Sequence, residues 1–147
     1  SDLSVPADLT ATSGAIDAGG NDIYVGGDFT ITSDLTNAAA VSFNGASGNQ
    51  TVSYAPGTWS VPTLDVDKAS GSLLLCTNVT ITTTACVTSG TLNVNGQTLT
   101  FPHGTSLYNA GTVTGNVVLE RPYSLVHDGS LMVASPLDRV THSSLHT

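Results

Sequence analysis

The residues of this sequence best suited to acid–base chemistry are two aspartates, Asp65 and Asp67, followed by the cation Lys68. The two aspartates alternate along one expected strand, so their side chains point to the same side of it. Glycoside hydrolysis needs two carboxylates placed across a sugar. The neighbouring segments supply no second acidic pair. We therefore favour a solvated polar face, with Ca²⁺ binding as the alternative and a polysaccharide-active β-helix enzyme as a distant third.

The four histidines indicate neither a metal centre nor a catalytic triad. They are His103, His127, His142 and His146. None has metal-ligand spacing to another histidine or a cysteine within a helical or finger pattern. The run from His127 to Ser130 contains the residue types of a hydrolytic triad, but neighbours on one turn do not form that relay. The sequence therefore predicts no catalytic residue, no metal ligand and no enzyme.

Calcium is the one cofactor that the sequence leaves open. Asp17, Asp22 and Asp28 flank glycine-rich turns, where hard cations find oxygen ligands. The sequence contains neither the D-x-D-x-D-G loop nor the G-G-x-G-x-D repeat of calcium-binding proteins. We expect no cofactor, with Ca²⁺ as the alternative.

Two cysteines and three aromatic residues complete the candidates. Cys76 and Cys86 could form a disulfide in an oxidising compartment, or pack as two small hydrophobic side chains. Trp59, Tyr54 and Tyr108 could offer flat faces for stacking on sugars. Trp59 follows a Pro-Gly turn, and for this residue we favour a place at a core edge or a solenoid end.

The composition excludes two classes of partner. The 147 residues include 3 Lys and Arg against 11 Asp and Glu, for a net charge of −8. So few cations cannot neutralise a phosphate backbone, which argues against nucleic acid and anionic membrane surfaces. No stretch approaches the roughly 20 apolar residues that span a bilayer. Thr, Ser, Asn and Gly dominate instead, a mixture common in secreted β-rich proteins.

Period-two alternation indicates short strands and no helix. It is clearest at Asn78–Thr82, Thr91–Asn95 and Thr98–Phe101, and it predicts that Val79, Ile81, Leu92, Val94, Leu99 and Phe101 are buried. Further strands are expected at Asp22–Val25, Asp28–Thr32, Ala40–Phe43, Gln50–Tyr54, Thr63–Asp67, Ser72–Cys76 and Val117–Arg121. Gly, Asn and Pro turns separate them. Asp34–Ala40 is expected to be a loop, because it lacks a helical apolar stripe.

An internal repeat favours one all-β architecture over another. Ser13–Val25 aligns without gaps on Ser89–Phe101, 76 residues further on. Both read S-G-x-apolar-Asp/Asn, then a turn, then a second alternation. Short repeated strands with Gly and Asn corners predict a right-handed parallel β-helix, that is, a β-solenoid. A β-sandwich of hairpins, with Asn95-Gly96 as one hairpin turn, is the alternative.

Five segments carry a resemblance to a known class of protein. They are Ile23–Thr30, Val41–Ser53, Leu64–Thr82, Val87–Thr100 and Gly111–Arg121. In this order they resemble the β-solenoid repeat regions of large secreted and cell-surface proteins of Bacteroidetes. Ser130–Pro136 resembles the opening of the module that usually follows. The resemblance implies a solenoid domain over residues 1–121 and, at 122–147, a C-terminal extension or the start of another module.

The resemblance also implies a function without chemistry. Such regions serve as stalks, adhesin shafts or surface-layer material, often exported by type IX secretion, and share no catalytic residue set. We therefore expect an extracellular or cell-surface structural module that associates with itself or with neighbouring modules. A carbohydrate-binding module that recognises surface glycans is the alternative. The paired cysteines lie outside the resembling pattern.

Overall fold

The computed structural model describes residues 1–120 and the backbone of residues 124–127 and 130–133. The strands are β1 (Leu3–Val5), β2 (Leu9–Ala11), β3 (Ala15–Asp17), β4 (Ile23–Val25), β5 (Phe29–Ile31), β6 (Asp34–Thr36), β7 (Ala40–Phe43), β8 (Gln50–Tyr54), β9 (Trp59–Leu75), β10 (Val79–Phe101), β11 (Ser106–Asn109), β12 (Thr112–Leu119), β13 (Ser124–His127) and β14 (Ser130–Val133). These residues contain no helix able to cross a bilayer.

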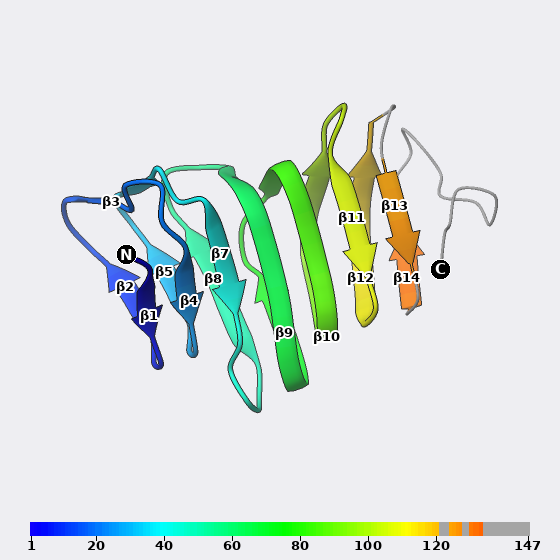
Figure 1. The fold of residues 1–147 in the computed structure, drawn as a ribbon, viewed down its shortest axis with the longest axis horizontal. Coiled ribbons are helices and arrows are strands. Elements are labelled where there is room, and N and C mark those ends of the chain that lie inside the picture. The colour runs from blue at the N-terminus through cyan, green and yellow to red at the C-terminus, as the bar shows by residue number, and fades with distance from the viewer. Residues whose placement is uncertain (121–123, 128–129, 134–147) are drawn as a thin grey trace.

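The strands wind into a β-solenoid of about 6 turns, stacked along the long axis of the molecule (Figure 1). On its first side, β1, β4, β7, β9, β10, β11 and β13 pair in that order. Partners are 18 to 23 residues apart, as Ile23, Val41 and Leu64 illustrate. Every pairing in this ladder is parallel. Hairpins would pair antiparallel, so the β-solenoid prediction is confirmed and the β-sandwich alternative is wrong.

Two further sides complete each turn. On the second side, β2, β5 and β8 stack in that order. The C-terminal part of β9 stacks next, and its Leu75 pairs with Val52 of β8. On the third side, β3 pairs with β6, and Trp59 of β9 pairs with Val79 of β10. The two longest strands, β9 and β10, therefore run around corners and contribute to all three sides. Register shifts in their pairing mark the bends.

Some expected strands match well and one expectation is wrong. Ala40–Phe43 and Gln50–Tyr54 are strands with the expected bounds. The expected loop at Asp34–Ala40 instead begins with β6, where Leu35 pairs with Ile16 and packs against the core. Its three residues are too short to show a periodic pattern, so only pairing with the preceding turn identifies them as a strand.

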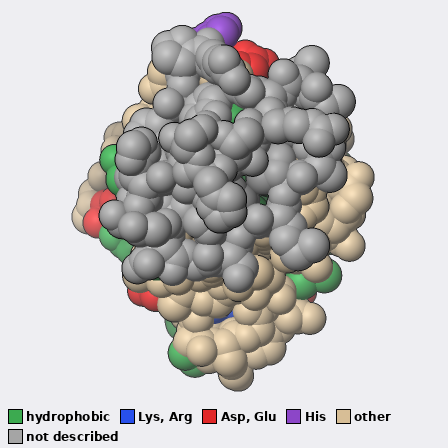
Figure 2. Space-filling model, turned by 90° about the vertical axis from the view of Figure 1, so that its right-hand side faces the viewer, with side chains coloured by type: hydrophobic (Ala, Val, Ile, Leu, Met, Phe, Trp, Pro, Cys, Tyr) green, Lys and Arg blue, Asp and Glu red, His purple; other side chains and the backbone are tan. Residues whose placement is uncertain are grey.

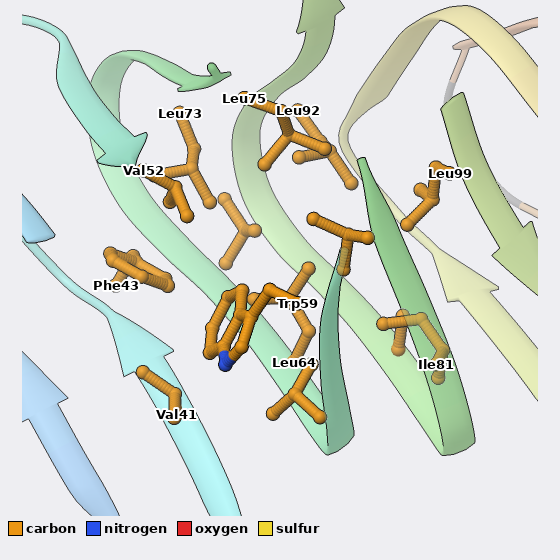
Figure 3. Packing of buried hydrophobic residues seen from close by; sticks show 14 of the residues in the cluster. Val41, Phe43, Val52, Trp59, Leu64, Leu73, Leu75, Ile81, Leu92 and Leu99 are labelled. Carbon is orange, nitrogen blue, oxygen red and sulfur yellow. The ribbon is translucent and has the colours of Figure 1, made fainter. Parts of the chain in front are cut away.

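The core follows the predicted alternation. Val79, Ile81, Leu92, Val94, Leu99 and Phe101 are each at most 1% exposed, which confirms their expected burial. Leu73, Leu75 and Leu92 from the second side converge with Val41 and Leu64 from the first (Figure 3). Inside a three-sided coil, every strand contributes alternate side chains to one shared apolar column.

The internal repeat reproduces a corner rather than a whole turn. Gly19 and Gly20 have φ of 61° and 81°, and their aligned residues Asn95 and Gly96 have φ of 57° and 76°. The first corner leads from β3 on the third side to β4 on the first side. The second lies within β10 and leads from the second side to the third. Asn95-Gly96 therefore turns the coil between parallel neighbours instead of closing a hairpin.

Strands β13 and β14 pair with β11 and β12. They stack on the solenoid beyond residue 121, and the domain boundary expected there stays a prediction.

Candidate functional site

The candidate site is an outward-facing row of side chains on the first side of the solenoid. The row consists of Tyr24, Ser42, Asp65, Cys86 and Tyr108, one from each successive turn. Their neighbours along each strand point inward and are buried, so the row follows from period-two alternation. Adjacent parallel strands lie about 4.8 Å apart, so the row forms one line along the solenoid axis. We call it the axial row.

Electrostatics single out Asp65 within the axial row. The Ser42 hydroxyl donates to Asp65 Oδ2 at 3.0 Å, and Ser42 itself is 8% exposed. Burial raises the pKa of the Asp65 carboxyl, the bond from Ser42 opposes that change, and the charges of Asp22 and Asp67 add to the rise. Asp65 is therefore a half-buried acid held against a hydroxyl.

Tyr24 lies in the acidic field at one end of the axial row. Its pKa is raised chiefly by the charge of Asp22, then by burial, Asp2 and Asp65. Tyr108, toward the other end, is 45% exposed. The row thus presents an aromatic ring on either side of a short polar stretch, an arrangement that can stack on and hydrogen-bond to a sugar chain.

Asp67 does not extend the axial row as a second acid. It accepts a hydrogen bond from the Ser89 hydroxyl at 2.9 Å, and its register partner is Ser89, whereas the partner of Asp65 is Cys86. The carboxylate of Asp67 thus ties two turns together at the corner that follows the first side.

Lys68 is not the surface cation expected beside these acids. Its side chain is 0% exposed, and Lys68 Nζ donates to Gly45 O at 3.1 Å and to Gln50 Oε1 at 2.9 Å. Burial lowers the pKa of Lys68. It is the only Lys or Arg among residues 1–120, so the described surface of that range carries no Lys or Arg side chain. Among the coloured atoms of Figure 2, a few red acidic groups lie between tan and green side chains.

Two of the three aspartates considered for calcium, Asp17 and Asp28, accept hydrogen bonds from N–H groups of the same or the next turn. Asp28 Oδ1 accepts from Thr51 N at 2.8 Å. Asp17 Oδ1 accepts from Gly19 N and from Asn37 Nδ2, both at 2.9 Å, and these bonds lower the pKa of Asp17. The described residues contain no group of three His, Cys, Asp or Glu placed to hold a metal ion. Asp17 and Asp28 therefore have a structural role at the corners.

The three aromatic candidates separate in the structure. Trp59 is 2% exposed and packs on Phe29, with ring centroids 4.9 Å apart, so its ring has no face for a sugar. Tyr54 stacks on Trp59 at 6.5 Å, and its hydroxyl donates to Asp34 Oδ1 at 2.5 Å. Tyr108 is the exposed member of the three.

The two cysteines are free thiols on different sides of the coil. Cys76 is exposed after the second side, where its N–H donates to Val52 O at 2.8 Å. Cys86 lies in the axial row, with its Sγ 3.7 Å from the Thr88 hydroxyl. The third-side segment Val79–Ile81 separates them along the chain. The disulfide alternative is not the arrangement in this structure, because both side chains point outward from separate sides.

The histidine expectations fall largely outside the described side chains. His103 is exposed in the corner between β10 and β11. His127 and Ser130 are described only as backbone in β13 and β14. Asp128, His142 and His146 lie outside the described residues.

The sequence reasoning missed the buried corner around Gln50 and Lys68. Gln50 is 2% exposed, and its Nε2 donates to Val25 O at 3.0 Å and to Gly27 O at 2.5 Å. Glycines recur at this corner in successive turns, and that spacing was the available signal. A Cβ on Gly45 would lie 2.5 Å from Gly26 O, which shows how closely the turns approach there.

No protein-family model matches this sequence, and neither a curated protein nor a solved structure matches it. The fold defines the class: the chain is a parallel β-solenoid.

Proposed function

We propose that this chain is a non-catalytic structural module of an extracellular adhesin, stalk or filament. The observation that carries the proposal is where its polar side chains bind. Gln50, Lys68, Asp28 and Asn78 each hydrogen-bond a different turn, as do most of the other described polar side chains that make bonds. Groups that could act on a substrate instead hold the stack together.

The resemblance and the composition support the extracellular assignment. Up to Glu120, the five resembling segments lie within the described solenoid, and they are typical of secreted surface proteins of Bacteroidetes exported by the type IX route. Abundant Thr, Ser and Asn with few cations is also typical of secreted β-rich chains. Antibodies against residues 1–120 should label intact producing cells, and labelling only after lysis would contradict a surface location.

The N-terminal edge of the solenoid supports self-association or contact with a neighbouring module. Among the residues that the structure describes, strands β1, β2 and β3 each pair on one side only. Leu3 is 43% exposed, although it continues the ladder of buried residues that includes Ile23. Unpaired edges with uncovered apolar side chains favour strand addition. Electron microscopy of native material should show rods or fibres, and discrete compact particles that stay monomeric in light scattering would contradict association.

Carbohydrate binding is the second candidate, and the axial row is the observation that favours it. Tyr108 is exposed, and Asp65 and Cys86 lie between it and Ser42. A glycan array probed with the wild type should then show binding that Tyr108→Ala removes. Tyr54→Phe is the matched control, because it removes only a hydroxyl that binds Asp34. Absence of wild-type binding would reject this candidate and leave the structural proposal standing.

A further inference from the structure

The corner between the first and second sides changes in length along the solenoid. It takes residues 26–28 between β4 and β5, but residues 44–49 between β7 and β8. Within β9 it takes residues 67–71, and between β11 and β12 only residues 110–111. The two longest corners are therefore stacked directly on each other. These long corners allow β7 to shift along β9 without breaking the connections to the neighbouring strands.

Apolar burial alone does not fix the pairing at this step. Val41 and Phe43 pair with Leu64 and Val66, and all four are 0% exposed. A slip of one residue would turn apolar side chains outward, but a slip of two keeps each of them facing inward. Registers of β7 on β9 that differ by two residues therefore bury nearly the same apolar side chains. The long corners can accommodate a shift of two residues.

The buried polar contacts of Lys68 exist in one register only. Lys68 reaches from the β9 corner to Gly45 O and Gln50 Oε1 in the turn before it, and Gln50 Oε1 also accepts from Gly45 N at 3.0 Å. Gln50 Nε2 extends the network one turn further, to Gly27 O. A slipped pairing would leave several buried polar groups unbonded, each at about 1–3 kcal/mol.

Other polar contacts at this step are more exposed. Asn49 Oδ1 accepts from Ser72 N at 3.1 Å at the surface, where water can replace it. The Ser42–Asp65 bond is only partly buried. Lys68 also fills the corner column itself, because a Cβ on Gly90 of the next turn would lie 2.8 Å from Lys68 Cβ.

We propose that Lys68 and Gln50 form a register lock that selects one of several apolar-compatible pairings between β7 and β9. The lock joins the N-terminal turns to the long strands of the solenoid. It specifies which residues pair, in the way that single buried polar residues fix the register of coiled coils. The lock is independent of the proposed function, since pairing can be read without any ligand.

Disulfide trapping tests the lock directly. Cys76→Ser and Cys86→Ser remove the native thiols from every protein. The native reporter adds Ser42→Cys and Asp65→Cys, which are register partners. Two slipped reporters combine Ser42→Cys with Asp67→Cys or with Thr63→Cys. Cross-links formed under mild oxidation are quantified by mass spectrometry in the intact corner and in the Lys68→Met, Gln50→Met double variant.

With the corner intact, only the native reporter should cross-link. In the double variant, the yield from at least one slipped reporter should rise several-fold. Val66→Ala is the control, because it loosens the same strand without touching the lock, and its slipped yields should stay at background. If the double variant does not fold, Lys68→Met alone is read in the same way. Slipped yields that stay at background in the corner variants, or rise equally in Val66→Ala, would overturn the proposal.

Discussion

The first two turns of the solenoid and the turns built from β9 and β10 share the same three-sided coil but differ in strand length and burial. In residues 1–36, each strand has three residues, and β1, β3 and β6 have no fully buried position. In β9 and β10, strands of 17 and 23 residues bend around the corners with buried side chains at most alternate positions. Figure 1 shows the change from separate short arrows to continuous ribbons.

The two regions also differ in their charged residues. Residues 1–36 contain six aspartates and no cation: Asp2, Asp8, Asp17, Asp22, Asp28 and Asp34. Several cap a backbone N–H of the following turn, as Asp8 does for Asp28 N at 2.8 Å. The bonds made by Asp2 and Asp8 are exposed, so each contributes little net stability, whereas the bond that Asp28 accepts from Thr51 N is partly buried. The apolar column is therefore least complete in the first turn, is continued by β4 and β5, and is fullest in the long-strand turns.

The largest effect should come from the residue that connects the two regions. Trp59 is at the start of β9 and packs on Phe29 of β5 and on Tyr54 of β8. Trp59→Ala removes this packing and leaves a cavity, so it should lower the free energy of unfolding by about 3–5 kcal/mol. Denaturant titration followed by circular dichroism measures this loss.

Leu3→Ala is the matched control at the N-terminal edge. Leu3 is 43% exposed, so its truncation should cost less than about 1 kcal/mol. Equal losses for the two variants would show that the first turn is held as tightly as the middle of the solenoid, against the comparison drawn above.

The second-largest loss of stability should come from breaking hydrogen bonds at a buried corner, compared with an exposed corner. Gln50→Met keeps the shape of the side chain but removes its bonds to Val25 O, Gly27 O, Gly45 N and Lys68 Nζ. The expected loss is about 2–4 kcal/mol, because buried polar groups lose their partners. Asp8→Ala removes one exposed bond and should cost about 0.5–1 kcal/mol. Similar thermal unfolding midpoints for these two variants would contradict a special role for burial.

The sequence predicts what depends on neighbours along the chain. Alternation identified Val79 and Ile81 as core residues, and turn residues located Asn95-Gly96 as a bend. It could not show that Lys68 is buried, because that depends on a six-residue corner one turn earlier. The burial of Trp59 likewise depends on Phe29, which lies 30 residues away. Stacking between turns therefore determines whether residues such as Lys68 and Trp59 are buried or exposed.

The smallest effect is the contribution of carboxylate ionisation to stability, and its sign should differ between the two regions. Hydrogen bonds from Asn37 and Gly19 lower the pKa of Asp17, so its ionised form stabilises the fold above pH 3.8. That contribution is lost as the pH falls through the lowered value. Burial raises the pKa of Asp65 from 3.8, so its protonated form is the favoured one. That contribution is present below pH 3.8 and is lost as the pH rises through the raised value.

Neutral variants should therefore shift the thermal unfolding midpoint at pH 7 in opposite directions. Asp65→Asn removes a half-buried charge, keeps an acceptor for the Ser42 hydroxyl, and should stabilise the protein by less than about 1 kcal/mol. Asp17→Asn should lower the midpoint, because the charge that strengthens the bonds from Asn37 and Gly19 is gone. The Asp65→Asn difference should shrink as the pH falls through the raised pKa of Asp65 toward 3.8, whereas the Asp17→Asn difference should shrink as the pH falls below 3.8 through the lowered pKa of Asp17. A destabilised Asp65→Asn at pH 7 would mean that ionised Asp65 stabilises the first side, and that the two regions use their carboxylates in the same way.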